Sequence, residues 1–121
     1  MARPQIQVQR LGLDIDYDSA LELQRKLVQK RQSDEIGDQL LVLQHQPVIT
    51  IPRDRATQHL LVTEEDAEHQ GVQLRRTNRG GDITYHGPGQ WVLYPIVKLE
   101  HDERDVRRYV DHLEQAMIDT C

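Results

Sequence analysis

Phenylalanine is missing from this 121-residue sequence, and cysteine occurs once, at position 121. A single cysteine excludes an internal disulfide framework. The mean hydropathy is −0.69, and no apolar run approaches the roughly 18 residues that a membrane-spanning helix needs. The N-terminus also lacks the apolar stretch of a signal peptide. We therefore predict a cytoplasmic protein with no membrane partner, whose core rests on Leu, Val and Ile.

Basic residues are in the minority, with 15 Lys and Arg against 20 Asp and Glu, which gives a formal charge of −5. Charges of both signs are interspersed along the chain. Nucleic-acid-binding domains usually carry a basic excess, so this balance argues against a nucleic-acid partner. The six histidines show no metal-ligand spacing, and there is no cysteine pair. We therefore predict no metal site.

Hydrophobic periodicity predicts an alternation of strands and helices along the chain. Strands are predicted at Gln5 to Leu11, Leu40 to Leu43, His45 to Thr50, Val72 to Thr77 and Trp91 to Leu99. Helices are predicted from a cap at Asp16 or Asp18 to about Gln32, from Thr63 to His69, and from a cap at Asp102 onward. No repeat or linker divides the chain, so residues 1–121 are predicted to form part of one domain.

The last predicted helix carries an apolar stripe from Val106 to Cys121. No Gly, Asn or Pro closes this helix, so we predict that the chain stops inside its domain, as an N-terminal part of it. Cys121 falls at the C-terminal end of the helix, where the helix dipole disfavours a thiolate. It is therefore predicted to be a core residue or a residue at a cut end of the chain, and not a nucleophile.

The segment RGGDITYHGPGQ, from Arg79 to Gln90, contains four glycines and one proline around a Tyr-His pair. Gly80 and Gly81 predict a primed hairpin turn with positive φ, and Gly87-Pro88-Gly89 predicts a second turn. Two turns joined by a short strand, with His86 as a surface residue, would explain the composition. The alternative is a ligand site, in which the glycines let main-chain amides approach the ligand closely. The segment is neither a P-loop nor a dinucleotide fingerprint.

This segment, followed by WVLYPIVKL, resembles the signature of lipoyl(octanoyl) transferases. Those enzymes move an octanoyl group from acyl carrier protein to a lysine of lipoyl domains. QLLVLQHQPVIT, from Gln39 to Thr50, resembles the strand of that family that ends in His-x-Pro-Val-x-Thr. The resemblance implies an α+β fold of the biotin/lipoate protein ligase type, with a mixed, largely antiparallel sheet and flanking helices. The substrate-binding wall that it implies consists of Arg79, Gly80, Gly81, Asp82, Ile83, Thr84, Tyr85 and His86.

For an intact family member, the resemblance implies a two-step transfer through an acyl-cysteine, with a lysine beside the cysteine and without ATP or another cofactor. The family's Asn-Pro-Cys-Gly setting is absent here, and neither Cys121 nor Lys98 occupies an equivalent position. No catalytic residue is therefore assigned, and this chain alone is predicted to be inactive. The implied donor is octanoyl-acyl carrier protein. The implied acceptors are lipoyl domains of 2-oxoacid dehydrogenase complexes and the glycine cleavage H protein.

Five arginines form a basic subset that would complement an acidic carrier protein. They are Arg53, Arg55, Arg75, Arg76 and Arg79. Two alternatives to an octanoyltransferase remain open from the sequence. One is an ATP-dependent lipoate or biotin protein ligase, which shares the implied fold. The other is a non-catalytic module that binds an acyl chain or a carrier protein.

Overall fold

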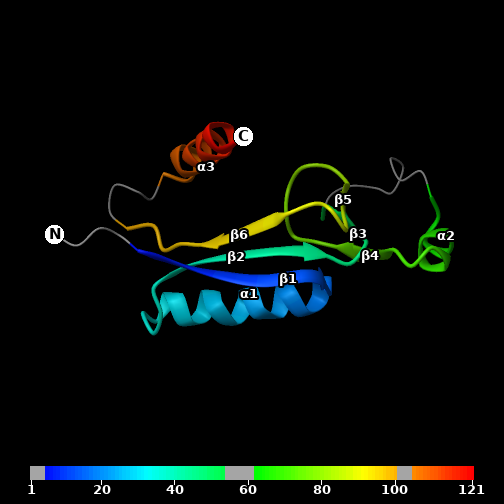
Figure 1. Ribbon diagram of the computed structural model, residues 1–121, viewed down its shortest axis with the longest axis horizontal. Helices are drawn as coiled ribbons and strands as arrows, with labels where there is room; N and C mark the ends of the chain where they lie inside the picture. Colours follow the sequence, from blue (N-terminus) through cyan, green and yellow to red (C-terminus); the bar gives the residue numbers. More distant parts are fainter. Residues whose placement is uncertain (1–4, 54–61, 101–104) are drawn as a thin grey trace.

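The structure of the protein is a computed structural model that describes residues 5–53, 62–100 and 105–121 (Figure 1). Its elements are β1 (Ile6–Ile15), α1 (Tyr17–Gln32), β2 (Asp38–His45), β3 (Val48–Ile51), α2 (Glu64–His69), β4 (Gln73–Arg76), β5 (Thr84–His86), β6 (Val92–Ile96) and α3 (Val106–Thr120). The strands form a first sheet with the order β1-β2-β6 and a second sheet with the order β4-β3-β5. Figure 1 shows α1 along one face of the first sheet and α3 on the opposite side.

Helix α1 covers one side of the main hydrophobic core. Asp16 caps its first turn, because its carboxylate accepts a hydrogen bond from the Ser19 amide at 3.0 Å. The helix buries Ala20 and Leu27 against strand residues of the first sheet, chiefly Leu41 and Leu43 of β2. Burying one such leucine contributes roughly 1.5–3 kcal/mol. The predicted helix is confirmed.

Strands β1 and β2 run parallel, with α1 as the crossover between them, whereas β2 and β6 run antiparallel. Strand β1 continues beyond its predicted end at Leu11. The register shifts around Gly12, where φ is 95°, and again before Ile15, close to Asp14 with a φ of 60°. These irregularities bend the strand and allow pairing to resume at Ile15 and His45.

The second sheet corrects the predicted hairpin at Gly80 and Gly81. Strands β4 and β5 do not pair with each other, because β3 lies between them, parallel to β4 and antiparallel to β5. The segment that joins them therefore crosses over β3. Gly81 has a φ of 95°, whereas Gly80 does not lie in the left-handed region. The predicted α+β class with mixed sheets is confirmed, and each described sheet contains one parallel and one antiparallel pair.

Two short connections join the sheets. Strand β2 leads to β3 through Gln46 and Pro47, and β5 leads to β6 through residues 87–91. In the second connection the Gln90 amide donates to the Gly87 carbonyl at 3.1 Å, and Gly89 has a φ of 90°. This is a type II turn with Pro88 at its second position, as predicted. The Gly89 amide also donates to Gln44 Oε1 at 2.9 Å, which ties this connection to the end of β2.

Helix α3 begins after Asp105, whose carboxylate accepts from the Arg108 amide at 3.1 Å. The predicted cap at Asp102 lies outside the described residues. Within the described residues, no helix combines the length and the apolar character needed to cross a membrane. In the same parts of the chain, no group of three or more His, Cys, Asp or Glu side chains could hold a metal ion.

Candidate functional site

Arg79, at the start of the predicted wall, binds the main chain of its own protein. Its Nη2 donates to Thr50 Oγ1 at 2.7 Å and to the Thr50 carbonyl at 3.2 Å, and its Nη1 donates to the Gly80 carbonyl at 2.9 Å. Thr50 is buried in β3, so these bonds satisfy acceptors that water does not reach. Arg79 therefore fixes the segment of residues 80–84, the glycine bend, to β3. Its guanidinium is not a free charge.

The bend that Arg79 fixes is closed by local hydrogen bonds. A Cβ on Gly81 would contact Arg79 Nη1 at 3.4 Å, and the φ of 95° is one that other residues rarely adopt. Asp82 Oδ1 accepts from the Ile83 amide at 2.8 Å, and Thr84 Oγ1 donates to the Asp82 carbonyl at 3.3 Å. The bend is thus a defined loop whose conformation requires glycine at position 81.

Strand β5 presents the rest of the predicted wall. Thr84 and His86 pair with the buried residues Thr50 and Val48 and are half-buried, whereas Tyr85 is exposed. The short strand predicted between the two turns is therefore confirmed, and its side chains alternate between the two faces. The Tyr85 ring lies over Gly87, where a Cβ would overlap it, so glycine at this position lets the ring lie against the main chain.

His86 is held by the turn that follows it. Its Nδ1 is hydrogen bonded to Gln90 Oε1, and Gln90 Nε2 donates to the Tyr85 carbonyl at 3.2 Å. A glutamine oxygen can only accept, so Nδ1 of His86 carries a proton. In the neutral ring, Nε2 is then the acceptor.

Beside His86 lies a buried histidine to which the sequence assigned no role. His45 is 0% exposed. Its Nδ1 lies 3.1 Å from the Ile15 carbonyl, which can only accept, so Nδ1 donates and Nε2 accepts from the Tyr94 hydroxyl at 2.7 Å. The centroid of its ring lies 6.0 Å from that of His86 and 5.3 Å from that of Tyr17. The sequence held a signal for this burial, because His45 continues the inward-facing series of Leu41 and Leu43.

Burial favours the neutral forms of His45 and Tyr94. Desolvation lowers the pKa of His45 below its usual value of 6.5, and the neighbouring His86 acts in the same direction. The Ile15 carbonyl and, more weakly, Asp16 oppose this shift. Burial also raises the pKa of Tyr94 to about 12. The hydroxyl of Tyr94 therefore keeps its proton and continues to donate to His45.

The lowered pKa of His45 predicts that stability depends on pH near neutrality. The unfolded chain binds a proton at this residue more readily than the folded chain, so acidification favours unfolding. The free energy of unfolding that depends on neutral His45 is fully present above the pKa of this residue in the unfolded chain. It is lost as pH falls through the lower pKa that His45 has in the folded chain. Between about pH 7.5 and about pH 5.5, we expect wild type to lose more urea stability than the His45→Gln variant. Equal losses in the two proteins would contradict the assignment.

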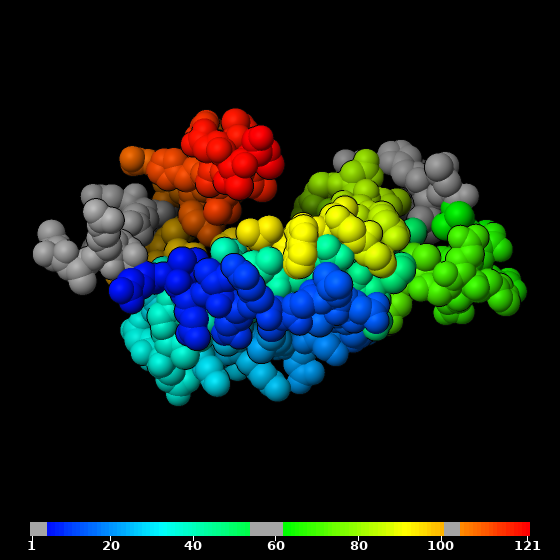
Figure 2. All heavy atoms as spheres, viewed as in Figure 1, coloured from blue at the N-terminus to red at the C-terminus, as the bar shows by residue number. Residues whose placement is uncertain are grey.

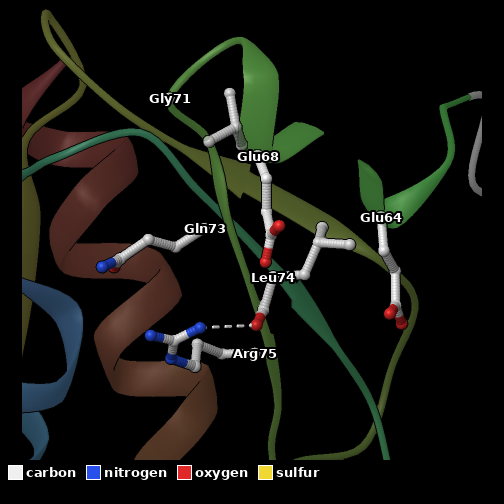
Figure 3. Close-up of a pocket in the computed structure, with 7 residues that line it drawn as sticks. Glu64, Glu68, Gly71, Gln73, Leu74 and Arg75 are labelled. Atoms are coloured by element: carbon white, nitrogen blue, oxygen red, sulfur yellow. Dashed lines mark hydrogen bonds between the residues drawn. The ribbon is translucent and has the colours of Figure 1, made fainter. Parts of the chain in front are cut away.

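Two hollows open elsewhere on the described surface. One, of about 430 Å³, lies between α2 and β4, and its lining includes Glu64, Glu68 and Arg75 (Figure 3). The other, of about 320 Å³, lies beside β6 and is lined in part by Val28 and Val97. Neither is lined by the segment from Arg79 to His86. The role of that segment as a substrate-binding wall stays a prediction.

The remaining candidate residues are engaged within the chain or exposed. Arg75 pairs with Asp18 through Nε at 2.9 Å and Nη2 at 3.0 Å, so this member of the arginine subset is already paired. Arg55 lies outside the described residues. Lys98 Nζ pairs with Asp34 at 2.8 Å. Cys121 is an exposed free thiol at the C-terminal cap of α3, so of its two predicted roles, core residue or residue at a cut end, it does not have the first.

Comparisons of the sequence with known proteins match the chain to one family. The family model described as the lipoyl protein ligase A/B catalytic domain matches residues 16–121. An octanoyltransferase of Solibacter usitatus is 50% identical over 106 residues, which are 88% of this chain and 48% of that protein. The mitochondrial octanoyltransferase LIP2 of Arabidopsis thaliana is 43% identical over 114 residues, which are 94% of this chain and 48% of that protein. The chain thus spans about half the length of the curated relatives it matches.

Solved structures show the same fold at low sequence identity. P. falciparum LipL1, in complex with lipoate, has a TM-score of 0.59 at 15% identity, over 74% of this chain and 29% of that one. A putative lipoate protein ligase from T. acidophilum has a TM-score of 0.56 at 14% identity, over 89% of this chain and 42% of that one. The fold therefore defines an α+β domain of the lipoate-ligase class.

The chain belongs to the lipoyl protein ligase A/B catalytic domain family, whose model covers all but its first 15 residues. Within that family, the resemblance to octanoyltransferases is confirmed by relatives of that name at 41–50% identity.

Proposed function

We propose that this chain forms the acyl-binding wall of an octanoyltransferase of lipoate biosynthesis. The observation that carries the proposal is the 50% identity to an octanoyltransferase over 88% of this chain. The donor in this proposal is octanoyl-acyl carrier protein. The acceptors are lysines of lipoyl domains and of the glycine cleavage H protein. A lipoyl domain as acceptor is supported by a structural neighbour from Thermoplasma acidophilum, a bi-partite lipoate protein ligase described together with its E2 lipoyl domain.

The reaction consists of two acyl exchanges. A cysteine thiolate attacks the thioester carbonyl, the new carbon–sulfur bond forms, and the carrier leaves as its thiol. The lysine amine of the lipoyl domain then attacks the acyl-cysteine, forms the amide and releases the cysteine. In both steps an acyl group that is already activated as a thioester passes to a new acceptor, so ATP is not consumed. The reaction needs a reduced thiol, so the proposal places it in the cytoplasm.

The reacting cysteine and its lysine are proposed to come from outside residues 1–121. Cys121 lies at the C-terminal end of α3, where the helix dipole disfavours a thiolate. Lys98 is paired with Asp34 at 2.8 Å and its main-chain amide donates to Asp38 at 3.1 Å. Neither residue is therefore assigned a step in the proposed reaction.

The residues of the wall have separate tasks in this proposal. Arg79 fixes the bend to β3, and Gly81 provides the positive φ that the bend requires. Ile83 and Tyr85 contact the octanoyl chain, where each buried methylene contributes roughly 0.8 kcal/mol. His86, fixed through Nδ1 by Gln90, directs Nε2 at the thioester.

A hybrid enzyme tests the proposal. Residues 1–121 replace the matching part of the Solibacter usitatus octanoyltransferase, and octanoyl transfer from carrier protein to a lipoyl domain is measured without ATP. The hybrid is expected to be active and the 121-residue chain alone inactive. Tyr85→Ala is expected to reduce kcat/KM about tenfold through lost alkyl contact, and Tyr85→Phe by less than about twofold.

The same assay separates the alternatives. A folded hybrid that transfers no octanoyl group would contradict the proposal. Activity that depends on ATP and passes through an acyl-adenylate would identify a ligase instead. Octanoylation of Cys121 in the isolated chain would show that the nucleophile lies within residues 1–121.

A further inference from the structure

The first sheet is covered on only one of its faces within the described structure. Helix α1 packs on the face that carries Leu41 and Leu43. The opposite face carries Val8, Leu40, Val42 and Leu93, because the register sets Val8 beside Leu40 and Leu93 beside Val42. Val8 is 50% and Leu93 53% exposed. An apolar stripe thus crosses all three strands of the sheet.

Helix α3 stands on the same side as this stripe with its own apolar face open. Among residues 105–121, none is buried. Val106, Val110 and Met117 recur at helical spacing on one face, and Met117 is 60% exposed. Figure 2 shows α3 separated from the second sheet by an open gap, with no described segment packed into it. A 15-residue helix is marginally stable without tertiary packing.

The stripe and the helix face together make a docking surface, defined by Val8, Leu93, Val106, Val110 and Met117. Soluble monomers rarely expose contiguous apolar patches of this kind without a partner. A partner that covers the docking surface would contact both α3 and the face of the first sheet that lies opposite α1.

We infer that this docking surface binds the other half of an octanoyltransferase domain. The inference rests on the proposed function and on the length of the curated relatives. The curated relatives match this chain over 46–48% of their own length in the four first-ranked cases, so they carry about as much polypeptide again. A second copy of this chain fits less well, because it brings an identical charge of −5 against the first.

The binding experiment uses this chain and a separately produced partner. The partner is the part of the Solibacter usitatus octanoyltransferase that lies outside the match. Analytical ultracentrifugation of the mixture is expected to show a one-to-one complex. Leu93→Lys and Val110→Glu are each expected to raise the dissociation constant at least about tenfold, since each places a charge in an apolar interface.

Leu13→Lys is the matched control. Leu13 is exposed but lies at the bulged end of β1, outside the docking surface, and its substitution is expected to change the dissociation constant by less than about twofold. Circular dichroism confirms that each variant is folded. No complex in the mixture, or equal weakening by all three substitutions, would overturn the inference. So would a homodimer of this chain that Leu93→Lys dissociates.

Binding and catalysis are read separately, so the two proposals can fail independently. A complex that transfers no octanoyl group would contradict the proposed function and leave the docking surface in place. An active covalent hybrid whose separated halves do not associate would overturn the docking surface and leave the function in place.

Discussion

Replacing His45 with alanine is expected to lower the free energy of unfolding by about 3 kcal/mol. The substitution empties a buried position among the rings of Tyr17, His86 and Tyr94. It also leaves the Ile15 carbonyl and the Tyr94 hydroxyl without the partners that they have at 3.1 Å and 2.7 Å. Urea denaturation followed by circular dichroism measures the loss.

Two further variants divide this loss between the ring and its hydrogen bonds. Tyr94→Phe keeps the ring but leaves Nε2 of His45 without its donor, and is expected to cost about 1 kcal/mol. Tyr85→Ala removes an exposed ring on the neighbouring strand and is expected to change stability by less than about 0.5 kcal/mol. A His45→Ala variant as stable as Tyr85→Ala would show that the buried ring of His45 and its two hydrogen bonds do not stabilise the fold.

Arg79→Ala is expected to cost about 2 kcal/mol and to release the glycine bend. The guanidinium is the donor to the buried Thr50 carbonyl and to Thr50 Oγ1, and it also holds Gly80. Without it, the bend loses its attachment to β3. Hydrogen exchange of the amides from Gly81 to Thr84 is therefore expected to accelerate more than that of β2.

Arg79→Lys provides the sharper comparison. A lysine keeps the charge but cannot make three hydrogen bonds with the geometry of a planar guanidinium, so it is expected to recover less than half of the loss. Arg107→Ala, on the exposed surface of α3, controls for removal of a charge. If Arg79→Lys restores both stability and exchange rates, charge and not hydrogen-bond geometry holds the bend.

Local patterns in the sequence were sufficient to predict the helices and most strands. Asp16 with the apolar spacing after it predicted α1 closely, and the cap at Thr63 predicted α2. The strand predicted from Trp91 to Leu99 shortens to Val92–Ile96. These elements depend on capping and periodicity, which neighbouring residues specify.

Pairing between distant strands could not be predicted in the same way. Paired glycines between two strand-like runs are typical of a hairpin, yet β3 lies between β4 and β5. Which strand fills that place depends on segments about thirty positions earlier in the chain, as the pair Thr50 and Thr84 shows. The network around His45 is equally non-local, since Ile15 and Tyr94 come from two other strands.

The two connections between the sheets emerge side by side, since Gly89 of one is bonded to Gln44 beside the other. The sheets are also tied through the start of α1, because Arg75 of β4 pairs with Asp18 at 2.9 Å and Gln73 donates to Asp16 at 3.3 Å. His45 ends the strand before one connection and His86 ends the strand before the other, and their rings are in contact. The two imidazoles therefore meet where both connections begin, so a substitution at either histidine changes a contact that both sheets share.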